Sequence, residues 1–404
     1  MRQPTHRQRA HAQIIALFAL SLPVLILFVG LGVDLGLAFV TRANLSKAVD
    51  AAALAAMRNI SQGQAEATAI AQSAFDANYP SGLLNANPPV LSVSISTDAN
   101  NNSVVNVSAT ATIDTSFLRL LPGFKTVQVS SSAQATRPKL IMSIVLDKSG
   151  SMNLNGGAQA LPPAVVGQYG FLTYFDNNED QVAEISFSSV ASVDVAMGTQ
   201  FLAPITQVVD HMSFGGATFS QAGLQDGLNQ INSVPVAAGE YVVKVEVFFT
   251  DGWANTEQGN LDCPPSTLLN FGGCSPPEAA LGWCGGISFL NPVTGNEVGC
   301  GATTFQSEVA GGTQQLTELN ISNDAMYRAV QVANNMRSQG IVVYSIGLGT
   351  TISEAFLQQI ANDPASSTYN PNEPVGEAVF APTAADLQSA FQTIASAILL
   401  RLSR

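Results

Sequence analysis

The chain has 404 residues, of which 46% are hydrophobic and 11% are charged, and its formal net charge is -13 at pH 7. This length and apolar content suffice for two or three domains with real cores and exclude bulk disorder. The negative balance, with no basic patch to offset it, excludes nucleic acid as an expected partner.

Residues 14–33 form a continuous run of uncharged, strongly apolar positions. At 1.5 Å per helical residue, this run spans a hydrocarbon core of about 30 Å, so it predicts a transmembrane helix. A cleaved signal peptide is the alternative, but its apolar region is shorter and ends at a small-residue cleavage site, whereas the helical pattern here continues past Asp34. Asp34 is interpreted as a boundary residue that stays hydrated at the outer membrane–water interface.

The charges around the apolar run predict its orientation. Arg2, Arg7 and Arg9 precede the run, while Arg42 and Lys47 follow it. The positive-inside rule therefore places the N-terminus in the cytoplasm by a narrow margin.

All cysteines of the chain lie in one Gly/Pro-rich stretch: Cys263, Cys274, Cys284 and Cys300. Their spacing contains no C-x-x-C pair, which favours two disulfides over a zinc site, and three pairings stay open. Disulfides require an oxidising compartment. We therefore expect a single-pass protein of a bacterial inner membrane, with its C-terminal part in the periplasm or exposed at the cell surface.

The segment after the apolar run changes its periodicity at about residue 90. Before this point an alanine-rich helical stripe continues to Tyr79 and Pro80. From Val90 to Ile113 apolar residues alternate with polar ones around the turn "TDANNN", which predicts a hairpin, and "TVQVSSSAQAT" predicts a third strand of a small antiparallel sheet.

From Lys139 onward, predicted strands and helices alternate, as in a doubly wound, mostly parallel α/β sheet. The predicted strands are Leu140–Leu146, Val182–Phe187, Val193–Met197, Tyr241–Thr250 and Ile341–Gly347. The predicted helices cover about 159–175, 219–232, 323–338, 353–362 and 384–400. Residues 255–322 break this rhythm and are predicted to be a surface insertion that contains the cysteines.

Polar side chains follow the buried strand that ends at Asp147. In "LIMSIVLDKSGSM" the residues Asp147, Ser149 and Ser151 come directly after the strand, at the carboxyl edge of the sheet, where open α/β folds bind ligands. A second apolar strand ends in "VFFTDG" with Asp251, and Thr218 lies in the glycine-rich "GGATFS". Two carboxylates and three hydroxyls are hard oxygen ligands, which suit Mg²⁺ first, with Mn²⁺ or Ca²⁺ as alternatives.

This ordered set, D-x-S-G-S, then a Thr loop, then T-D-G, resembles the metal-ion-dependent adhesion site (MIDAS) of von Willebrand factor type A domains over about residues 139–400. The resemblance implies a non-enzymatic, Rossmann-like metal-binding domain at 138–404, in which a partner carboxylate completes the coordination. It implies these metal ligands: Asp147, Ser149, Ser151, Thr218 and Asp251.

The N-terminal segment has its own resemblance. An apolar run that ends in V-D at Asp34 and leads to "AVDAAALAAM" is similar to the TadE/TadG-like proteins of the tight-adherence (Flp) pilus system. With this resemblance the chain divides into a TadE/TadG-like anchor at 1–60, a helix end with a small sheet at 61–137, and the domain that begins at 138. No Gly followed five residues later by Glu precedes the run, so a permanent anchor is expected.

These features together predict a membrane-anchored, metal-dependent protein-binding module that assists assembly or anchoring of a Flp/Tad-type adhesion pilus, with pilus components as partners. A cell-surface adhesin that binds an external ligand through the same metal site is the alternative. A serine hydrolase fits poorly, because His6 and His11 precede the apolar run and leave only His211 as a base. Trp253 and Trp283 either shape a partner surface or fill a local core.

Overall fold

The structure is a computed structural model that describes residues 6–60, 63–80, 82, 86–98, 102–238, 240–257, 261–262, 284–285, 288–290, 297–299 and 304–402. For residues 6–16 and for the short strands between 261 and 299, it describes the backbone alone. The chain divides into two compact units, Met1–Arg137 and Pro138–Leu402, and each has a hydrophobic core of its own.

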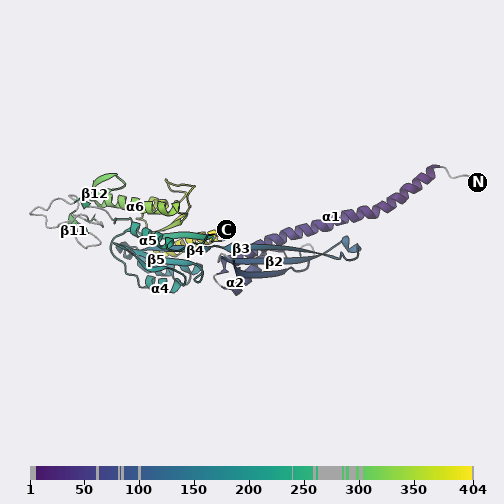
Figure 1. Ribbon diagram of the computed structural model, residues 1–404, viewed down its shortest axis with the longest axis horizontal. Coiled ribbons are helices and arrows are strands. Elements are labelled where there is room, and N and C mark those ends of the chain that lie inside the picture. Colours follow the sequence, from purple (N-terminus) through teal and green to yellow (C-terminus); the bar gives the residue numbers. More distant parts are fainter. Residues whose placement is uncertain are drawn as a thin grey trace, which may run out of the picture. The chain divides into compact units, whose positions relative to one another are not determined.

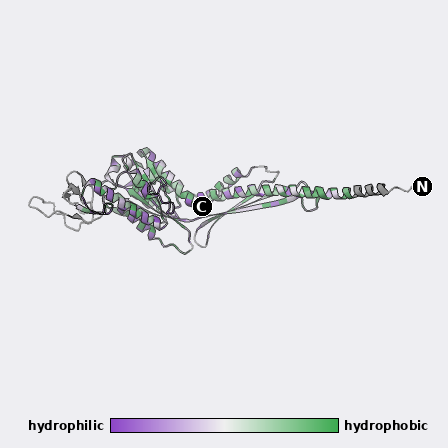
Figure 2. Cartoon of the chain, turned by 90° about the horizontal axis from the view of Figure 1, so that it is seen from above, coloured by the Kyte–Doolittle hydropathy of each residue, from purple (hydrophilic) through white to green (hydrophobic). Residues whose placement is uncertain are grey.

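The first unit is built on one long helix, α1, which covers His6–Arg58. From Leu17 to Val40 this helix exposes many large apolar side chains. Figure 2 shows them as green segments along α1. The helix is long and apolar enough to cross a membrane, which agrees with the membrane span predicted at residues 14–33.

Beyond the apolar part, α1 presents an alanine-rich face to the rest of the unit. Helix α2, Gln64–Asn78, folds back onto this face through Ala67, Ala71 and Phe75. The prediction of one helix continuing to Tyr79 is therefore wrong. The chain turns before α2 at Gly63, whose φ of 100° is readily adopted only by glycine.

The expected hairpin and third strand form a three-stranded antiparallel sheet in the order β1-β2-β3. Its strands are β1 Val90–Thr97, β2 Ser103–Asp114 and β3 Thr126–Arg137. Val107 pairs with Val93 on one side and with Ala133 on the other, so one apolar face is continuous across all three strands. This face packs on the alanines of α1, and Figure 1 shows β2 and β3 running beside that helix.

The second unit contains a six-stranded sheet in the order β15-β14-β7-β4-β5-β6, in which all neighbours are parallel except β5 and β6. Its strands are β4 Lys139–Asp147, β5 Gln181–Phe187, β6 Ala191–Gly198, β7 Val242–Thr250, β14 Val342–Leu348 and β15 Ala378–Ala381. Numbered along the chain, this is the doubly wound order 3-2-1-4-5-6. The predicted fold class is confirmed.

Helices cover both faces of this sheet, and the central strand β4 explains how. Met142 and Ile144 belong to different cores from Ile141 and Val145, because successive side chains of a strand point to opposite faces. The helices that pack on one face of the sheet are α3 Gly157–Val165, α4 Leu202–Asp210 and α8 Leu387–Leu402. The helices that pack on the opposite face are α5 Ser220–Asn232, α6 Glu318–Ser338 and α7 Glu354–Ala361.

Three local differences separate this unit from the prediction. The helix expected at 159–175 ends at Val165, because the backbone turns tightly at Gly167 and Gly170, where a side chain would collide with neighbouring backbone atoms. Helix α4 and the four-residue strand β15 were not predicted. Helix α6 begins at Glu318 with a Thr317 cap, inside the range predicted as insertion, which also contains the hairpin of β12 Thr304–Ser307 and β13 Gly312–Gln315.

The predicted insertion also contains the described residues 255–257 and four short strands: β8 Leu261–Asp262, β9 Cys284–Gly285, β10 Ser288–Leu290 and β11 Glu297–Gly299. Cys263, Cys274 and Cys300 lie outside the described residues, as does Trp283, and only the backbone of Cys284 is described. The disulfides therefore stay a prediction.

Candidate functional site

The carboxyl ends of β4 and β7 bring Asp147 and Asp251 to the same edge of the sheet. The two strands are adjacent and parallel, with Leu146 opposite Phe249, so the residues that follow them meet at one edge. Asp147 is fully buried and Asp251 is 1% exposed. This position outside the carboxyl ends of the central strands is where the doubly wound sheet binds its ligands.

Hydrogen bonds fix both carboxylates in place. Asp147 Oδ1 accepts from the backbone N–H of Ser149 at 2.7 Å, and its Oδ2 accepts from the Thr250 hydroxyl at 2.5 Å. Asp251 Oδ1 accepts from the Ser151 hydroxyl at 2.6 Å, and its Oδ2 accepts from Asn155 Nδ2 at 3.0 Å. The hydroxyls of Ser149 and Ser151 lie 3.0 Å apart, so these oxygens form one continuous cluster.

A third loop closes on the first through backbone hydrogen bonds. The Gly150 N–H donates to the carbonyl of Gly216 at 3.1 Å, and the Gly215 N–H donates to the carbonyl of Lys148 at 2.8 Å. Gly216 has a φ of 86°, and a side chain there would press on Ser189. The glycines that precede Thr218 therefore allow the close approach of the two loops.

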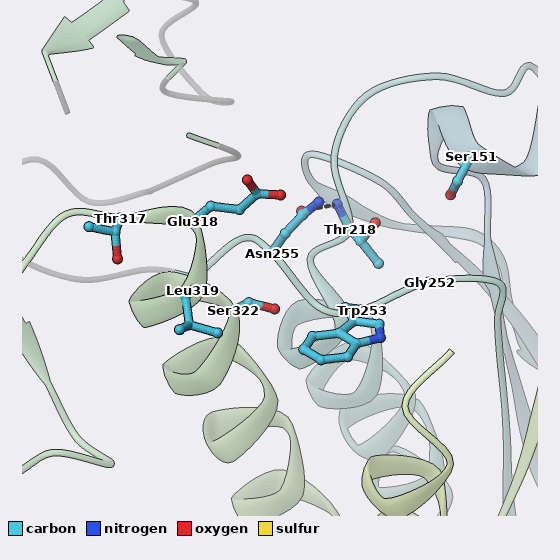
Figure 3. Close-up of a pocket in the computed structure, with 9 residues that line it drawn as sticks. All are labelled: Ser151, Thr218, Gly252, Trp253, Asn255, Thr317, Glu318, Leu319 and Ser322. Carbon is cyan, nitrogen blue, oxygen red and sulfur yellow. Dashed lines mark hydrogen bonds between the residues drawn. The ribbon is translucent and has the colours of Figure 1, made fainter. Parts of the chain in front are cut away.

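Thr218 is held from the loop after β7. Its N–H donates to Asn255 Oδ1 at 2.7 Å, and the Asn255 N–H donates back to the Thr218 carbonyl at 3.1 Å. Figure 3 shows this reciprocal pair facing each other, with Ser151 on a separate loop. Three loops thus contribute to one edge of the sheet. Whether all five predicted ligands surround one point stays a prediction.

The electrostatics of this edge favour a cation. Burial, and next to it repulsion from the nearby Asp251, raise the pKa of Asp147 to about 7 against the opposing effect of its hydrogen bonds. Burial also raises the pKa of Asp251. Within the part of the chain that the structure describes, no lysine or arginine forms an ion pair with either carboxylate. No described basic side chain is therefore paired with these two carboxyl groups.

The donor set fits a hard divalent cation. Among the described residues no three His, Cys, Asp or Glu side chains gather as a metal-binding group, so hydroxyls would have to supply the remaining ligands. Asp147, Ser149, Ser151, Thr218 and Asp251 provide oxygen atoms alone, which suits Mg²⁺, Mn²⁺ or Ca²⁺ and not softer metals. Thr250, Asn155 and Asn255, which orient this set, were not predicted as site residues.

A pocket of about 520 Å³ opens beside these loops. Figure 3 shows its lining, which joins Ser151 and Thr218 to the segment after β7 and to the start of α6. Two large apolar side chains, Trp253 and Leu319, are 44% and 61% exposed there. Trp253 therefore does not fill a local core. Its exposure leaves the other interpretation, a surface that contacts a partner, as a prediction.

Among the side chains that the structure describes, no histidine forms a hydrogen bond with Ser149 or Ser151. His211 is the one histidine whose side chain is described, and its Nδ1 lies 2.9 Å from the carbonyl oxygen of Gln207 at the end of α4. Ser151 instead donates to Asp251. The Ser–His pairing that commonly activates a nucleophilic serine is therefore not observed for Ser151 among the described side chains.

Comparison with known proteins identifies the N-terminal segment. Residues 13–59 match the family described as putative Flp pilus-assembly TadE/G-like, which confirms the resemblance predicted for this segment. A search of curated proteins finds no match.

Among solved structures, the neighbours include von Willebrand factor type A domains and pilus proteins. The von Willebrand factor domain of a type V pili tip protein from Porphyromonas gingivalis is 16% identical, with 66% of this chain and 97% of that chain covered and a TM-score of 0.42. The PilB minor pilin from Streptococcus sanguinis is 15% identical, with 79% and 80% covered and a TM-score of 0.43.

A third neighbour is proximal thread matrix protein 1 from the mussel byssus, described with a zinc-occupied MIDAS motif. It is 16% identical, with 65% of this chain covered and a TM-score of 0.37. The chain spans 46% of the length of that protein. At these identities the likeness concerns the fold.

The hydrogen bond from Thr250 to Asp147 gives a testable stability prediction. We expect Thr250→Val to lower the free energy of unfolding of residues 138–404 by about 1.5–3 kcal/mol, because a buried ionised carboxylate loses a hydroxyl donor. Urea denaturation at pH 8 in the presence of a chelator measures this loss. Thr250→Ser keeps the hydroxyl and is the matched control, and equal losses in both variants would contradict the assigned role of the hydrogen bond.

Proposed function

We propose that this protein is a non-enzymatic, membrane-anchored module that binds a partner protein through a divalent cation and assists assembly or anchoring of a Flp/Tad-type pilus. One observation carries the proposal: two buried carboxylates, Asp147 and Asp251, lie beside hydroxyls at the sheet edge, and no described lysine or arginine forms an ion pair with them. The TadE/G-like match at residues 13–59 supports the link to a pilus system.

The roles of the residues follow from their contacts. Asp147 and Asp251 would supply the negative charge, while Ser149, Ser151 and Thr218 would supply neutral oxygen ligands. Thr250 and Asn155 orient the two carboxylates through their hydrogen bonds. When bound, Mg²⁺ or a similar ion supplies a positive charge that accepts an oxygen ligand from outside the protein.

The adjacent pocket defines what else the partner carries. A partner that approaches this edge meets Trp253 and Leu319 next to the loops of Ser151 and Thr218. The wall formed by α6 is tied to the loop of Trp253, because the Ser322 hydroxyl donates to the Ala254 carbonyl at 2.7 Å. We therefore infer a partner segment with a carboxylate for the cation and a neighbouring apolar side chain for the pocket.

Cation binding is the first prediction. Residues 138–404 should bind Mg²⁺ or Mn²⁺ at one site in calorimetric titrations, and at 100 times the dissociation constant the ion should stabilise the fold by about 2.7 kcal/mol. Asp147→Asn should abolish the heat of binding. Asp210→Asn, which changes an exposed carboxylate at the end of α4, is the control that should bind normally. Unchanged binding by Asp147→Asn would remove the metal assignment.

The partner pocket is tested in cells that lack the natural gene. Complementation with Trp253→Ala should give few pili by electron microscopy, while the purified variant still binds the cation. Tyr241→Ala is the matched control, because this residue is 65% exposed and precedes β7, about 30 Å from the edge where that strand ends. Normal piliation by Trp253→Ala would refute the role of the pocket in assembly, and a loss of surface attachment alone would favour an adhesin.

We propose an inner-membrane location. The basic residues on either side of the apolar run 14–33 support an N-terminus in the cytoplasm and a second unit in the periplasm. Protease added to spheroplasts should then degrade the second unit while the membrane stays sealed. A cytoplasmic protein probed in the same sample controls for leakage. Protection of the second unit until the membrane is lysed would reverse the proposed orientation.

A further inference from the structure

The loop between β2 and β3, residues 115–125, is tied to α1 at the end of the apolar run. Both carboxylate oxygens of Asp34 take part: Oδ1 accepts from the Ser116 N–H at 2.9 Å, and Oδ2 accepts from the N–H groups of Phe117 and Leu118 at 3.0 and 2.7 Å. Asp34 is 4% exposed. Its carboxylate is therefore satisfied by this loop, and the expectation that it stays hydrated is wrong.

The loop also lies against the apolar run itself. A Cβ atom added to Gly30 would overlap the side chain of Phe117, so the ring packs directly on the backbone of α1 at that glycine. Gly30 lies about one helical turn before Asp34 and belongs to the apolar positions 14–33. The loop thus sits beside residues that are expected to be in the membrane.

The exposed surface of α1 indicates how deep this position is. Large exposed apolar side chains continue after Asp34 to Val40, and Arg42 is the next exposed charged residue on the helix. From Leu17 to Val40 the helix rises about 36 Å, which exceeds the hydrocarbon core of about 30 Å but not the whole bilayer with its headgroups. With residues 14–33 as the part that crosses the hydrocarbon core, Leu35 to Val40 extend into the headgroup layer, and the contact of the loop at residues 30–34 lies at the outer end of the span.

The composition of the loop matches this depth. Two large apolar side chains of the loop are exposed: Leu120 is 73% exposed and Phe124 is 54% exposed. Exposure of such side chains to water is unfavourable. Arg119 and Lys125 stand next to them and are also exposed, while Asp114 at the base of the hairpin carries the nearest exposed negative charge. Apolar side chains flanked by basic ones are typical of segments that lie in a phospholipid interface.

We propose that residues 115–125 form a membrane-docking loop, which inserts Leu120 and Phe124 into the leaflet where α1 leaves the bilayer and places Arg119 and Lys125 at the phospholipid headgroups. This second attachment fixes the three-stranded sheet against the bilayer surface. It is independent of the cation site, because all residues involved belong to the first unit.

The test uses the full chain in vesicles that contain phosphatidylcholine brominated on its acyl chains. Leu120→Trp should show blue-shifted emission that the brominated lipid quenches, beyond the signal of Trp253 and Trp283 in the unsubstituted protein. Thr97→Trp is the control, since Thr97 is exposed and pairs with Ser103 at the other end of β2, about 36 Å from the loop. Equal quenching of the two variants, or none in either, would overturn the proposal.

Two further variants guard against a local folding defect. Phe124→Trp should be quenched in the same way as Leu120→Trp. Adding Asp34→Ala to Leu120→Trp should reduce the quenching, because the loop loses the three hydrogen bonds that hold it at this depth. Blue-shifted emission that brominated lipid does not quench would mean that a protein surface covers the loop, and this result also contradicts lipid docking.

Discussion

The parallel pairing of β4 with β7 is the constraint on which the second unit depends. It places Asp147 and Asp251 at one edge of the sheet, both almost fully removed from water. Two carboxylates in such a place repel each other, and burial weakens the hydration that would otherwise offset this repulsion. The surrounding hydroxyls, amides and backbone N–H groups restrain both groups, but none of them supplies a positive charge. The fold thus holds a pair of negative charges that a cation would neutralise.

The first unit also contains a buried carboxylate, and protein groups alone satisfy it. Asp34 also brings a carboxylate to a buried place, but there three consecutive backbone N–H groups satisfy it. Such an arrangement resembles the anion sites of helix starts and tight backbone turns. The contrast is informative, because a carboxylate saturated by N–H donors has few lone pairs left for a metal ion. Asp34 is therefore a structural group that fastens the β2–β3 loop, whereas Asp147 and Asp251 keep hydroxyl neighbours that are themselves oxygen ligands.

Features that depend on a burial pattern over many residues could be predicted from the sequence. Features that depend on one residue or one contact could not. The mostly apolar sequence of β4 and the alternation in β2 each reflect burial over many residues, so the strands and the sheet class could be predicted. The break at Gly63 and the end of α3 at Val165 depend on individual glycines in close backbone turns. In the site, Asp147 and Asp251 were identifiable because each ends a buried strand. Asn155 and Asn255 were not, because they reach the site only through loops whose path the sequence pattern does not define.

The geometry of this edge supports the proposed binding role over hydrolysis. A nucleophilic serine needs a neighbouring base that accepts its proton, most often a histidine. Ser151 donates to Asp251, a carboxylate already close to a second one, and the ring of His211 is engaged at the end of α4. The proposed cation would fit the arrangement better, because it would relieve the repulsion between the two carboxyl groups and so stabilise the folded unit. Affinity for the ion and stability of the sheet edge then have one physical origin, and a partner carboxylate would add to both by bringing a further oxygen ligand.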